Sequence, residues 1–411
     1  MYDREERRIA PLLSRVKVLR ALGVLTILIL PLSILAVTSA PAQAATQFAC
    51  RFRFVPSPNV GSGDNGLDGV ATIGITNVWA VGGSAGQTLV EHWGGASWSV
   101  VSSPNVGSGS NFLNAVSADA PNDVWAVGAF ATTSGSQTLV EHWGGASWSV
   151  VSSPSPGSSF NFLYGVAAIS STDVWAVGDF QNTGGASQTL IEHWDGVSWS
   201  VVPSFSPGSS SNELRGVSAD ASNDVWAVGI LSNTGGSSQT LVEHWNGASW
   251  SVVPAVNFGS TLTEFFGVTS LAPNNVWAVG DFQNTGANQF VRPLTEHWNG
   301  ASWSVVPNPA ANIPGFGGNL HGVAATNSLR VWTVGEKSNN TTIDQTLAEH
   351  WTPAGWQVLN NPSIGTNFSF LRAVSAPKAQ TPVAFAWAVG AFLDNGAPSQ
   401  TLTELIVCTG G

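Results

Sequence analysis

Short runs of β-branched and aromatic residues, separated by turns rich in glycine, serine and asparagine, recur along the chain after residue 50. One run, V-W-A-V-G with small variations, returns every 46 to 55 residues. Its tryptophans are Trp79, Trp125, Trp175, Trp226, Trp277, Trp332 and Trp387. A period of about 40–50 residues indicates an array of supersecondary units, each the size of a four-stranded propeller blade.

The second repeat shows the pattern of one unit. Its β-branched and aromatic runs predict four strands at residues 112–118, 123–128, 137–143 and 147–151. Between the third and fourth strands of the first five units lies a Gly-Gly, Asp-Gly or Asn-Gly pair, such as Asn246-Gly247, which favours a tight primed hairpin turn. No helical period is sustained after residue 44, so the predicted fold class is all-β.

The spacing of the repeats predicts how the array closes. In four repeats the second-strand tryptophan follows the fourth-strand tryptophan of the preceding repeat by 27 residues, and counting back 27 residues from Trp79 reaches Phe52. The third-strand position that follows Trp387 is Ile406, and the chain ends soon after it. We therefore predict a seven-bladed β-propeller of four-stranded antiparallel blades, closed by pairing of the N- and C-terminal strands, which protects the open edge.

Two cysteines support this closure. Cys50 lies two residues before the predicted N-terminal strand position, and Cys408 lies two residues after the C-terminal one. In an intact blade these would be neighbouring positions of a hairpin turn, so we predict a Cys50–Cys408 disulfide. Such a bond closes a very long loop and would stabilise the fold by roughly 4–5 kcal/mol. Two unrelated buried thiols are the alternative.

The first 44 residues have the composition of a targeting segment. Basic residues are followed by an apolar run at 21–37 and by an A-x-A sequence that ends at Ala44. This order predicts a secretory signal peptide, residues 1–44, and one propeller domain over residues 45–411. An uncleaved membrane anchor is the alternative, although Pro31 interrupts the short apolar run. We expect a secreted, extracellular protein that is released or associated with the cell surface.

Charge and composition exclude several classes of protein. The chain carries 14 Lys+Arg and 25 Asp+Glu, a formal net charge of −11. A nucleic-acid binder needs a basic face, so we expect no nucleic-acid partner. The 19 tryptophans and few charged residues also exclude wholesale disorder. We expect no cofactor and no metal site.

The repeat resembles the kelch repeat, a propeller blade. The resemblance rests on Val-Trp-Ala-Val-Gly-Gly at 78–83, Leu-Val-Glu-His-Trp at 89–93 and Ser-Trp-Ser-Val-Val at 97–101, and it extends over nearly all of residues 50–411. It departs from the family at the Gly pair, which only the first repeat has complete. The chain also resembles tryptophan-rich repeat arrays of exported bacterial proteins. Both resemblances imply a propeller and say little about function.

Six histidines occupy equivalent positions in E-H-W segments. They are His92, His142, His193, His244, His297 and His350. A functional site is normally singular, so we interpret these residues as structural, with hydrogen bonds between blades that involve the adjacent glutamate. The repeated tryptophans are likewise expected to fill the space between blades.

Functional information should lie where the repeats differ. One first-strand position, whose neighbours repeat, is occupied by Asp68, Asn114, Tyr164, Arg215, Phe266, His321 and Arg372. The predicted loop between the second and third strands begins, after V-G, with Gly83, Ala129, Asp179, Ile230, Asp281, Glu336 and Ala391. First strands of propeller blades line the central channel, so both positions predict a ring of dissimilar side chains around one channel mouth.

The ring suggests a ligand-binding site. Arg215, Arg372 and His321 could bind an anionic or hydroxyl-rich ligand, and Tyr164 and Phe266 could stack on it. The carboxylates could accept hydrogen bonds; they are Asp179, Asp281 and Glu336. A solvent-facing rim whose sequence drifts freely is the alternative.

Three functions are compatible with these observations. The first is a monomeric, non-catalytic binding propeller for a carbohydrate, another cell-envelope ligand or a protein. The second is a hydrolase or lyase that acts on polysaccharide through the rim carboxylates. The third is a passive surface scaffold. The sequence contains no H-E-x-x-H, C-x-x-C or P-loop spacing, so we assign no catalytic residue and favour binding over catalysis.

Overall fold

The computed structural model describes residues 49–285, 290–313, 317–339, 342–361, 364–378 and 383–409. These lie in one compact unit, Thr46–Gly411. The predicted signal segment, residues 1–44, lies outside the described residues. In the part of the chain that the structure describes, no helix combines the length and hydropathy needed to cross a membrane.

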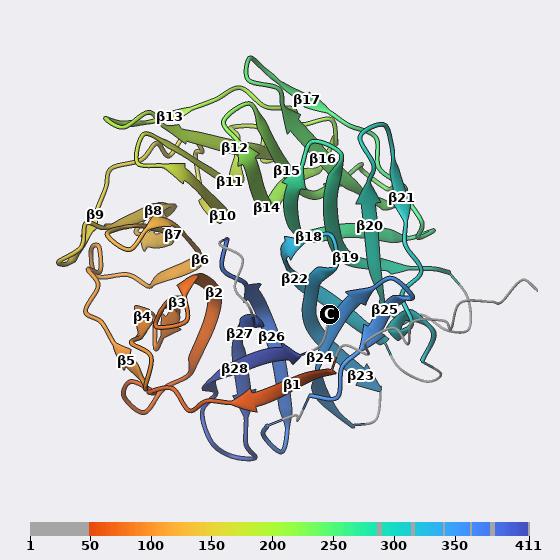
Figure 1. Ribbon diagram of the computed structural model, residues 1–411. Coiled ribbons are helices and arrows are strands. Elements are labelled where there is room, and N and C mark those ends of the chain that lie inside the picture. The colour runs from red at the N-terminus through yellow and green to blue at the C-terminus, as the bar shows by residue number, and fades with distance from the viewer. Residues whose placement is uncertain are drawn as a thin grey trace, which may run out of the picture. The chain divides into compact units, whose positions relative to one another are not determined.

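The unit is built from repeated four-stranded antiparallel sheets around a central channel (Figure 1). The innermost strands are β2 (Asn65–Gly74), β6 (Asn111–Ala120), β10 (Asn161–Ser170), β14 (Ser211–Ala221), β18 (Leu262–Ala272), β22 (Gly317–Asn327) and β26 (Phe368–Ser375). The second strands are β3 (Asn77–Ser84), β7 (Asp123–Thr132), β11 (Asp173–Gln181), β15 (Asp224–Ser232), β19 (Asn275–Gln283), β23 (Arg330–Asn339) and β27 (Ala384–Leu393).

The outer strands follow in the same order. The third strands are β4 (Gln87–Trp93), β8 (Gly135–Trp143), β12 (Ser187–Trp194), β16 (Ser238–Trp245), β20 (Arg292–Trp298), β24 (Thr342–Thr352) and β28 (Gln400–Thr409). The outermost strands are β5 (Trp98–Val100), β9 (Trp148–Val150), β13 (Trp199–Val201), β17 (Trp250–Val252), β21 (Trp303–Val305), β25 (Gly355–Val358) and β1 (Ala49–Phe54). A single 3-10 turn, η1 (Ala310–Asn312), interrupts the described strands.

The all-β prediction is confirmed, and the four predicted strands of the second repeat correspond to β6, β7, β8 and β9. The connection between third and fourth strands differs from the predicted primed turn. Trp245 pairs with Trp250, so the connection has four residues instead of two. Only its glycine is left-handed, with φ of 92° at Gly247, while the Asn246 Oδ1 accepts hydrogen bonds from the two backbone N–H groups that follow the glycine.

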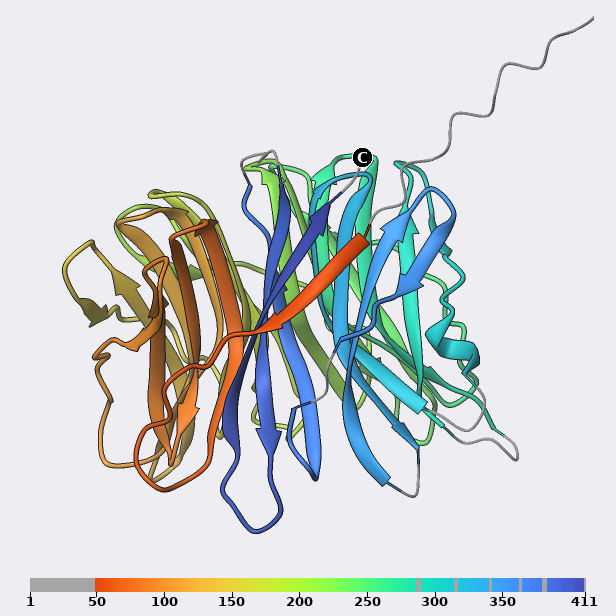
Figure 2. The same cartoon turned by 60° about the horizontal axis from the view of Figure 1, so that its bottom comes forward.

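The chain ends meet in a larger sheet. Five sheets among the described strands have four strands, and a sixth has eight in the order β1-β28-β27-β26-β24-β23-β22, with β25 paired to β24. Strand β1 is antiparallel to β28, and Figures 1 and 2 show the two side by side. Phe52 pairs with Ile406, which is the register that the repeat spacing predicts. One parallel pair, Asp344 and Phe368, joins β24 to β26.

The predicted disulfide is confirmed. Cys50 and Cys408 are paired residues of β1 and β28, and their Sγ atoms are bonded across 358 residues of chain. The bond therefore covalently joins the two strands at the place where other repeats have a hairpin turn.

Tryptophan side chains fill the layer between successive sheets. Trp226 of β15 is 1% exposed, and its ring centroid lies 5.2 Å from that of Trp298 and 5.6 Å from that of Trp303, both in the next sheet. The same trio recurs between other sheets, for example at Trp125, Trp194 and Trp199. Because these large rings are buried against a neighbouring sheet, each sheet depends on the next for its core.

The E-H-W histidines do not bond to the adjacent glutamates as predicted. Neighbouring residues of a strand point to opposite faces of the sheet, so the two side chains diverge. Instead, five of the histidines pair with an Asp or Asn at the start of the second strand of the same sheet. The Nε2–Oδ1 distances are 2.8 Å for His92–Asn77, 2.7 Å for His142–Asp123, 2.8 Å for His193–Asp173, 2.6 Å for His244–Asp224 and 2.9 Å for His297–Asn275.

Three of the glutamates, Glu243, Glu296 and Glu349, instead bond to the connections between sheets. Glu243 is fully buried in β16, and its Oε2 accepts a hydrogen bond from the backbone N–H of Phe205, in the segment that arrives from the preceding sheet. Glu349 likewise accepts from the side-chain amide of Asn308. Burial raises the pKa of Glu243 to about 8, so this carboxyl is largely protonated at neutral pH.

Candidate functional site

A β-bulge in each innermost strand positions the variable residue of the first strand. In β10, for example, Leu163 pairs with Gly178 and Gly165 pairs with Val177, so Tyr164 between them has no partner in the ladder. The same shift occurs in all seven innermost strands, and a bulge re-aims the side chain of its extra residue. These residues, the bulge ring, are Asp68, Asn114, Tyr164, Arg215, Phe266, His321 and Arg372.

The bulge ring lines one cavity of about 180 Å³ in the central channel. The fold therefore brings together seven predicted positions that span more than 300 residues of sequence, from Asp68 to Arg372. The small residue that follows each bulge keeps the inner strands close. A Cβ atom added to Gly216 would lie 2.8 Å from the carbonyl oxygen of Phe266, which is tighter than real contacts allow.

A second layer lies where the innermost strands enter the channel. The residue two before each bulge pairs with the residue after V-G, which lies within the second strand instead of the predicted loop, because the ladder continues past V-G. The entry layer consists of these pairs: Gly66–Gly83, Phe112–Ala129, Phe162–Asp179, Glu213–Ile230, Glu264–Asp281, Asn319–Glu336 and Phe370–Ala391. The three predicted carboxylates thus stand beside the bulge ring. Ala129, Ile230 and Ala391 are buried apolar residues, so they do not supply polar groups to a ligand.

Arg215 is held by two carboxylates. Its Nη1 donates to Glu264 Oε2 at 2.6 Å, and its Nη2 donates to Glu213 Oε2 at 3.2 Å. Its guanidinium carbon also lies 4.7 Å from the ring centroid of Phe266. The predicted cation is therefore neutralised within the protein, and it presents a stacked, hydrogen-bonded plane instead of an open positive charge.

Aromatic rings cover the wall contributed by β6 and β10. Phe162 stacks on Phe160 with a centroid distance of 5.6 Å and on Tyr164 at 6.0 Å, and Phe112 stacks on Phe162 at 6.1 Å. Asp179 accepts a hydrogen bond from Ser187 Oγ at 2.5 Å, and burial together with the nearby charge of Asp179 raises the pKa of the Tyr164 hydroxyl. This wall combines flat apolar faces with fixed polar groups.

The opposite wall centres on Arg372. Its Nη1 lies 3.2 Å from Nε2 of His321, and its guanidinium carbon lies 4.4 Å from the ring centroid of Phe370. His321 Nε2 is also 3.8 Å from Glu336 Oε1. Burial raises the pKa of the Glu336 carboxyl, but the neighbouring His321 and Arg372 outweigh it, so the pKa of Glu336 is lowered and the group stays ionised.

Three carboxyls of the site have raised pKa values, in each case mainly because burial disfavours their charge. The pKa of Asp179 is raised to about 6, and that of Asp281 is raised to about 8 with a further contribution from Glu264. The channel wall raises the pKa of Asp68 to about 6, although Arg372 opposes the shift and the side chain reaches the water of the channel. Asp281 is therefore largely protonated at neutral pH and can donate a hydrogen bond.

The sequence-based prediction missed the entry-layer residues of the first strands. Glu213 and Glu264 hold Arg215, Phe162 and Phe370 stack against the bulge ring, and Phe112 stacks on Phe162. The signal was present in the sequence, because this position also differs among repeats, with four residue types against six at the bulge position. The entry-layer and bulge positions lie two residues apart and share one face of the strand. A search for variable positions with a period of two would therefore have found both.

Two further cavities lie away from these residues. The larger, of about 710 Å³, is lined by residues of β19 to β21 and η1, including Phe258 and Arg292. The other, of about 530 Å³, lies at the opposite ends of the innermost strands. There Lys378 Nζ donates to the carbonyl oxygen of Ala168 at 3.0 Å, across the channel from its own strand. Neither cavity contains a predicted site residue.

No protein-family model matches the chain, and no curated protein matches it. Among solved structures, the chain is similar to one described as "YCF48 bound to D1 peptide", with a TM-score of 0.50 and 15% identity over 86% of this chain and 94% of that one. It is also similar to a protein of unknown function from Dyadobacter fermentans, with a TM-score of 0.48 and 10% identity over 88% of this chain and 99% of that one.

The first likeness, together with the repeated four-stranded sheets, defines the class of this protein as a β-propeller. At this level of identity the likeness concerns the fold alone. The resemblance to the kelch repeat stays a prediction.

Proposed function

We propose that this chain is a seven-bladed propeller whose last blade is closed by β1. The eight-stranded sheet contains one four-stranded set, β22 to β25, and a second set of β26, β27, β28 and β1. One parallel pair alone links the two sets, so they are two blades in contact. The disulfide and the register of Phe52 with Ile406 support closure at this point.

We further propose that the propeller is a secreted, non-catalytic binding protein that uses the channel mouth. The observation that carries this function is the bulge ring. Seven equivalent backbone positions carry six different residue types, while the framework around them repeats. Selection for stability alone would favour the same solution in every blade, whereas an asymmetric ligand needs a different group from each.

The chemistry of the mouth supports a carbohydrate as the ligand. Sugars present apolar C–H faces to aromatic rings and hydroxyl groups to charged or amide side chains. Phe162 and Tyr164 supply stacked rings on one wall, and Arg372 with His321 supplies donors on the other. Since Arg215 is already neutralised by Glu213 and Glu264, the mouth suits a hydroxyl-rich ligand better than a strongly anionic one.

A peptide is the second candidate, because the similar propeller named above is described as bound to a peptide. A peptide would use the same aromatic faces for its side chains and the same polar groups for its backbone. The two candidates predict the same binding residues and differ in the ligand that the mouth retains.

A binding screen tests the proposal. The purified, oxidised protein would be applied to a glycan array with cell-wall polysaccharides, and to a peptide array in parallel. We expect glycan binding that is lost in Tyr164→Ala and in Arg372→Ala. The control is Val197→Ala, because Val197 is 83% exposed in a connection between outer strands and binding should be unchanged by its loss.

Each other outcome has a definite meaning. Glycan binding that survives both mouth substitutions would place the site elsewhere and contradict the proposal. Binding only to peptides, with the same dependence on Tyr164 and Arg372, would contradict the carbohydrate assignment and retain the mouth. No retention of any probe by the folded protein would contradict binding at the mouth by either class.

A further inference from the structure

His350 differs from the five other E-H-W histidines whose environments are described. The side chains of His142, His193 and His244 are 27%, 26% and 24% exposed, whereas His350 is buried, with 1% exposure. The position that supplies Asp or Asn to the other rings is occupied here by Arg330.

The ring of His350 is also displaced from its usual neighbour. In the five other repeats the histidine and second-strand tryptophan centroids are 4.2 to 4.5 Å apart, but His350 and Trp332 are 5.5 Å apart. A repeated position has therefore acquired a different orientation in one blade, next to the place where the chain ends meet.

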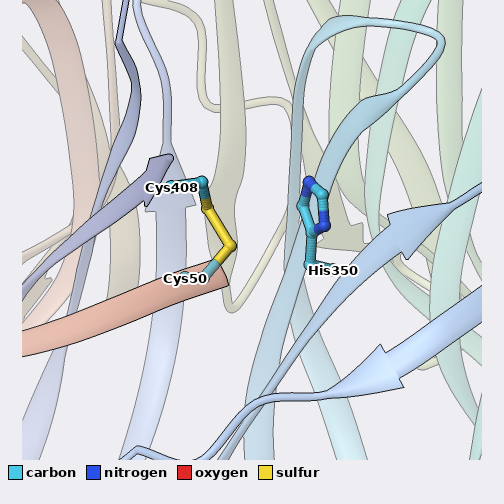
Figure 3. Close-up of side chains that lie close together, drawn as sticks. All are labelled: Cys50, His350 and Cys408. Atoms are coloured by element: carbon cyan, nitrogen blue, oxygen red, sulfur yellow. A yellow bond between two sulfur atoms is a disulfide. The ribbon is translucent and has the colours of Figure 1, made fainter. Parts of the chain in front are cut away.

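The neighbour of this ring is the disulfide. The potential ligand atoms of His350, Cys50 and Cys408 all lie within 4.8 Å of one another. Figure 3 shows them coming from three separate strands, with the disulfide bridging β1 and β28 and the imidazole rising from β24 beside it. The position is enclosed by apolar side chains that include Trp332, Ala348 and Ala384.

We propose that the dithiol form of this protein binds one thiophilic divalent cation, with Zn²⁺ as the best-suited ion, through Cys50, Cys408 and His350. Two thiolates and one imidazole form a donor set that zinc commonly takes, and a fourth position is left for water or another ligand. The oxidised form cannot bind the ion in this way, because both sulfur atoms are used in the disulfide.

An external dithiol can reduce the disulfide. The dithiol transfers two electrons and two protons, so the Cys50–Cys408 bond breaks to give two thiols while the reductant becomes a disulfide. Binding of the cation then releases two protons from the thiols and leaves a neutral complex with two thiolates and one imidazole. Because this complex is neutral, it adds no net positive charge beside Arg330, whose charge acts on His350.

The strand pairing keeps the sulfur atoms close after reduction. Cys50 and Cys408 are directly opposed in the antiparallel pair of β1 and β28, and the ladder continues through Phe54 and Glu404. Backbone hydrogen bonds therefore hold the two thiols near each other without the covalent bond. The third ligand is held independently by β24, so the site is assembled before the ion arrives.

Cobalt binding tests the proposal, because Co²⁺ replaces Zn²⁺ in such sites and shows thiolate charge-transfer bands. The purified protein would be reduced with a phosphine, freed of reductant without oxygen and titrated with Co²⁺, then with Zn²⁺. We expect one Co²⁺ per chain, thiolate bands that Zn²⁺ removes, and no such bands for the oxidised protein. Removal of a group that only hydrogen-bonds to a metal ligand lowers metal affinity roughly 10–100-fold. His350→Asn removes a ligand itself, so we expect its Co²⁺ affinity to fall at least as much.

The matched control is His297→Asn, the same substitution at the equivalent position of another repeat. Cobalt affinity should be unchanged in this variant and abolished in Cys50→Ser. Tryptophan fluorescence of the reduced protein reports whether the fold persists. Equal affinity in His350→Asn and wild type would overturn the proposal, as would the absence of thiolate bands in folded, reduced protein. A reduced chain that unfolds, and that the metal does not refold, would overturn it as well.

Discussion

Two regions of the molecule bury side chains in different ways. The layer between blades uses the same residues repeatedly, whereas the channel mouth uses different residues from blade to blade. Between blades, one trio of tryptophans and one buried glutamate recur from sheet to sheet, as at Trp226 and Glu243. At the mouth, equivalent positions carry an acid, a base or an aromatic ring in different blades, as at Asp68, Arg215 and Phe266. Repetition in one region and variety in the other separate framework from site within a single fold.

The buried carboxyls of the two regions differ in their protonation and in their partners. Glu243 is isolated from cations and accepts a backbone N–H, so it is held mainly in its protonated form. Glu264 lies beside Arg215 at 2.6 Å and shares that cation with Glu213. A neutral acid anchors a connection at little electrostatic cost, whereas a charged network fixes side chains in defined positions around a cavity.

The largest effect is expected from the tryptophan layer. Trp226→Ala should remove a fully buried ring that contacts two tryptophans of the next sheet, and it should lower the free energy of unfolding by about 3–5 kcal/mol. Denaturant unfolding followed by fluorescence measures the loss. The comparison variant is Phe266→Ala in the mouth, which is only partly buried. Equal losses for both would remove the distinction between framework and site.

Loss of the disulfide should come next. Replacing Cys50 and Cys408 together with alanine should lower the free energy of unfolding by about 2–5 kcal/mol, because the unfolded chain gains freedom when its ends are released. Thermal and denaturant unfolding of both forms provide the measurement. If stability does not change, pairing of β1 with β28 holds the chain ends without help from the bond.

The glutamates between blades predict a dependence of stability on pH. Burial raises the pKa of Glu141 from its ordinary 4.5 to about 8, so the folded chain holds this proton to higher pH than the unfolded chain does. The stabilisation is complete below about pH 4.5 and is lost as the pH rises towards 8, with a slope of at most about 1.4 kcal/mol per pH unit for each such carboxyl.

The variant Glu141→Gln isolates one of these groups. Because the amide cannot ionise, the fall of unfolding free energy between pH 5 and 8 should be shallower in the variant than in wild type. Urea unfolding at several pH values measures both slopes. Identical slopes would show that Glu141 is ionised in the folded protein.

A smaller loss is expected from the charged network at the mouth. Arg215→Ala leaves Glu213 and Glu264 without their cation and should cost about 1–3 kcal/mol, less than a fully buried pair because Arg215 is 23% exposed. Glu264→Gln combined with Arg215→Ala should cost less than the sum of the single variants. Strict additivity in a double-mutant cycle would contradict the coupling.

The smallest effect is expected at Tyr164. In Tyr164→Phe the ring stack with Phe162 is retained and only the hydroxyl near Asp179 is lost, so the free energy of unfolding should change by less than about 1 kcal/mol. The pKa of Asp179 should rise further, since the tyrosine hydroxyl lowers it in the wild type. Carboxyl NMR titration measures this shift, and Asp281 serves as the internal reference.

Much of the framework was predictable because it repeats. The spacing of tryptophans located the strands, placed Phe52 opposite Ile406 and indicated the Cys50–Cys408 disulfide. The variable first-strand position likewise pointed to one channel, because its neighbours repeat while it does not. The partners of these residues were not predictable in the same way. The contact of Arg215 with Glu264 joins two sheets whose separation depends on how closely the inner strands approach.

The sequence by itself thus determined the strand pattern, the register of the chain ends and which positions vary, because periodicity and spacing are properties of the chain alone. Only the tertiary structure decided where the side chains point. The bulges turn seven residues into one cavity, the opposite faces of a strand separate His142 from Glu141, and the meeting of three strands brings His350 beside the disulfide. These outcomes depend on packing between sheets, which a one-dimensional period does not contain.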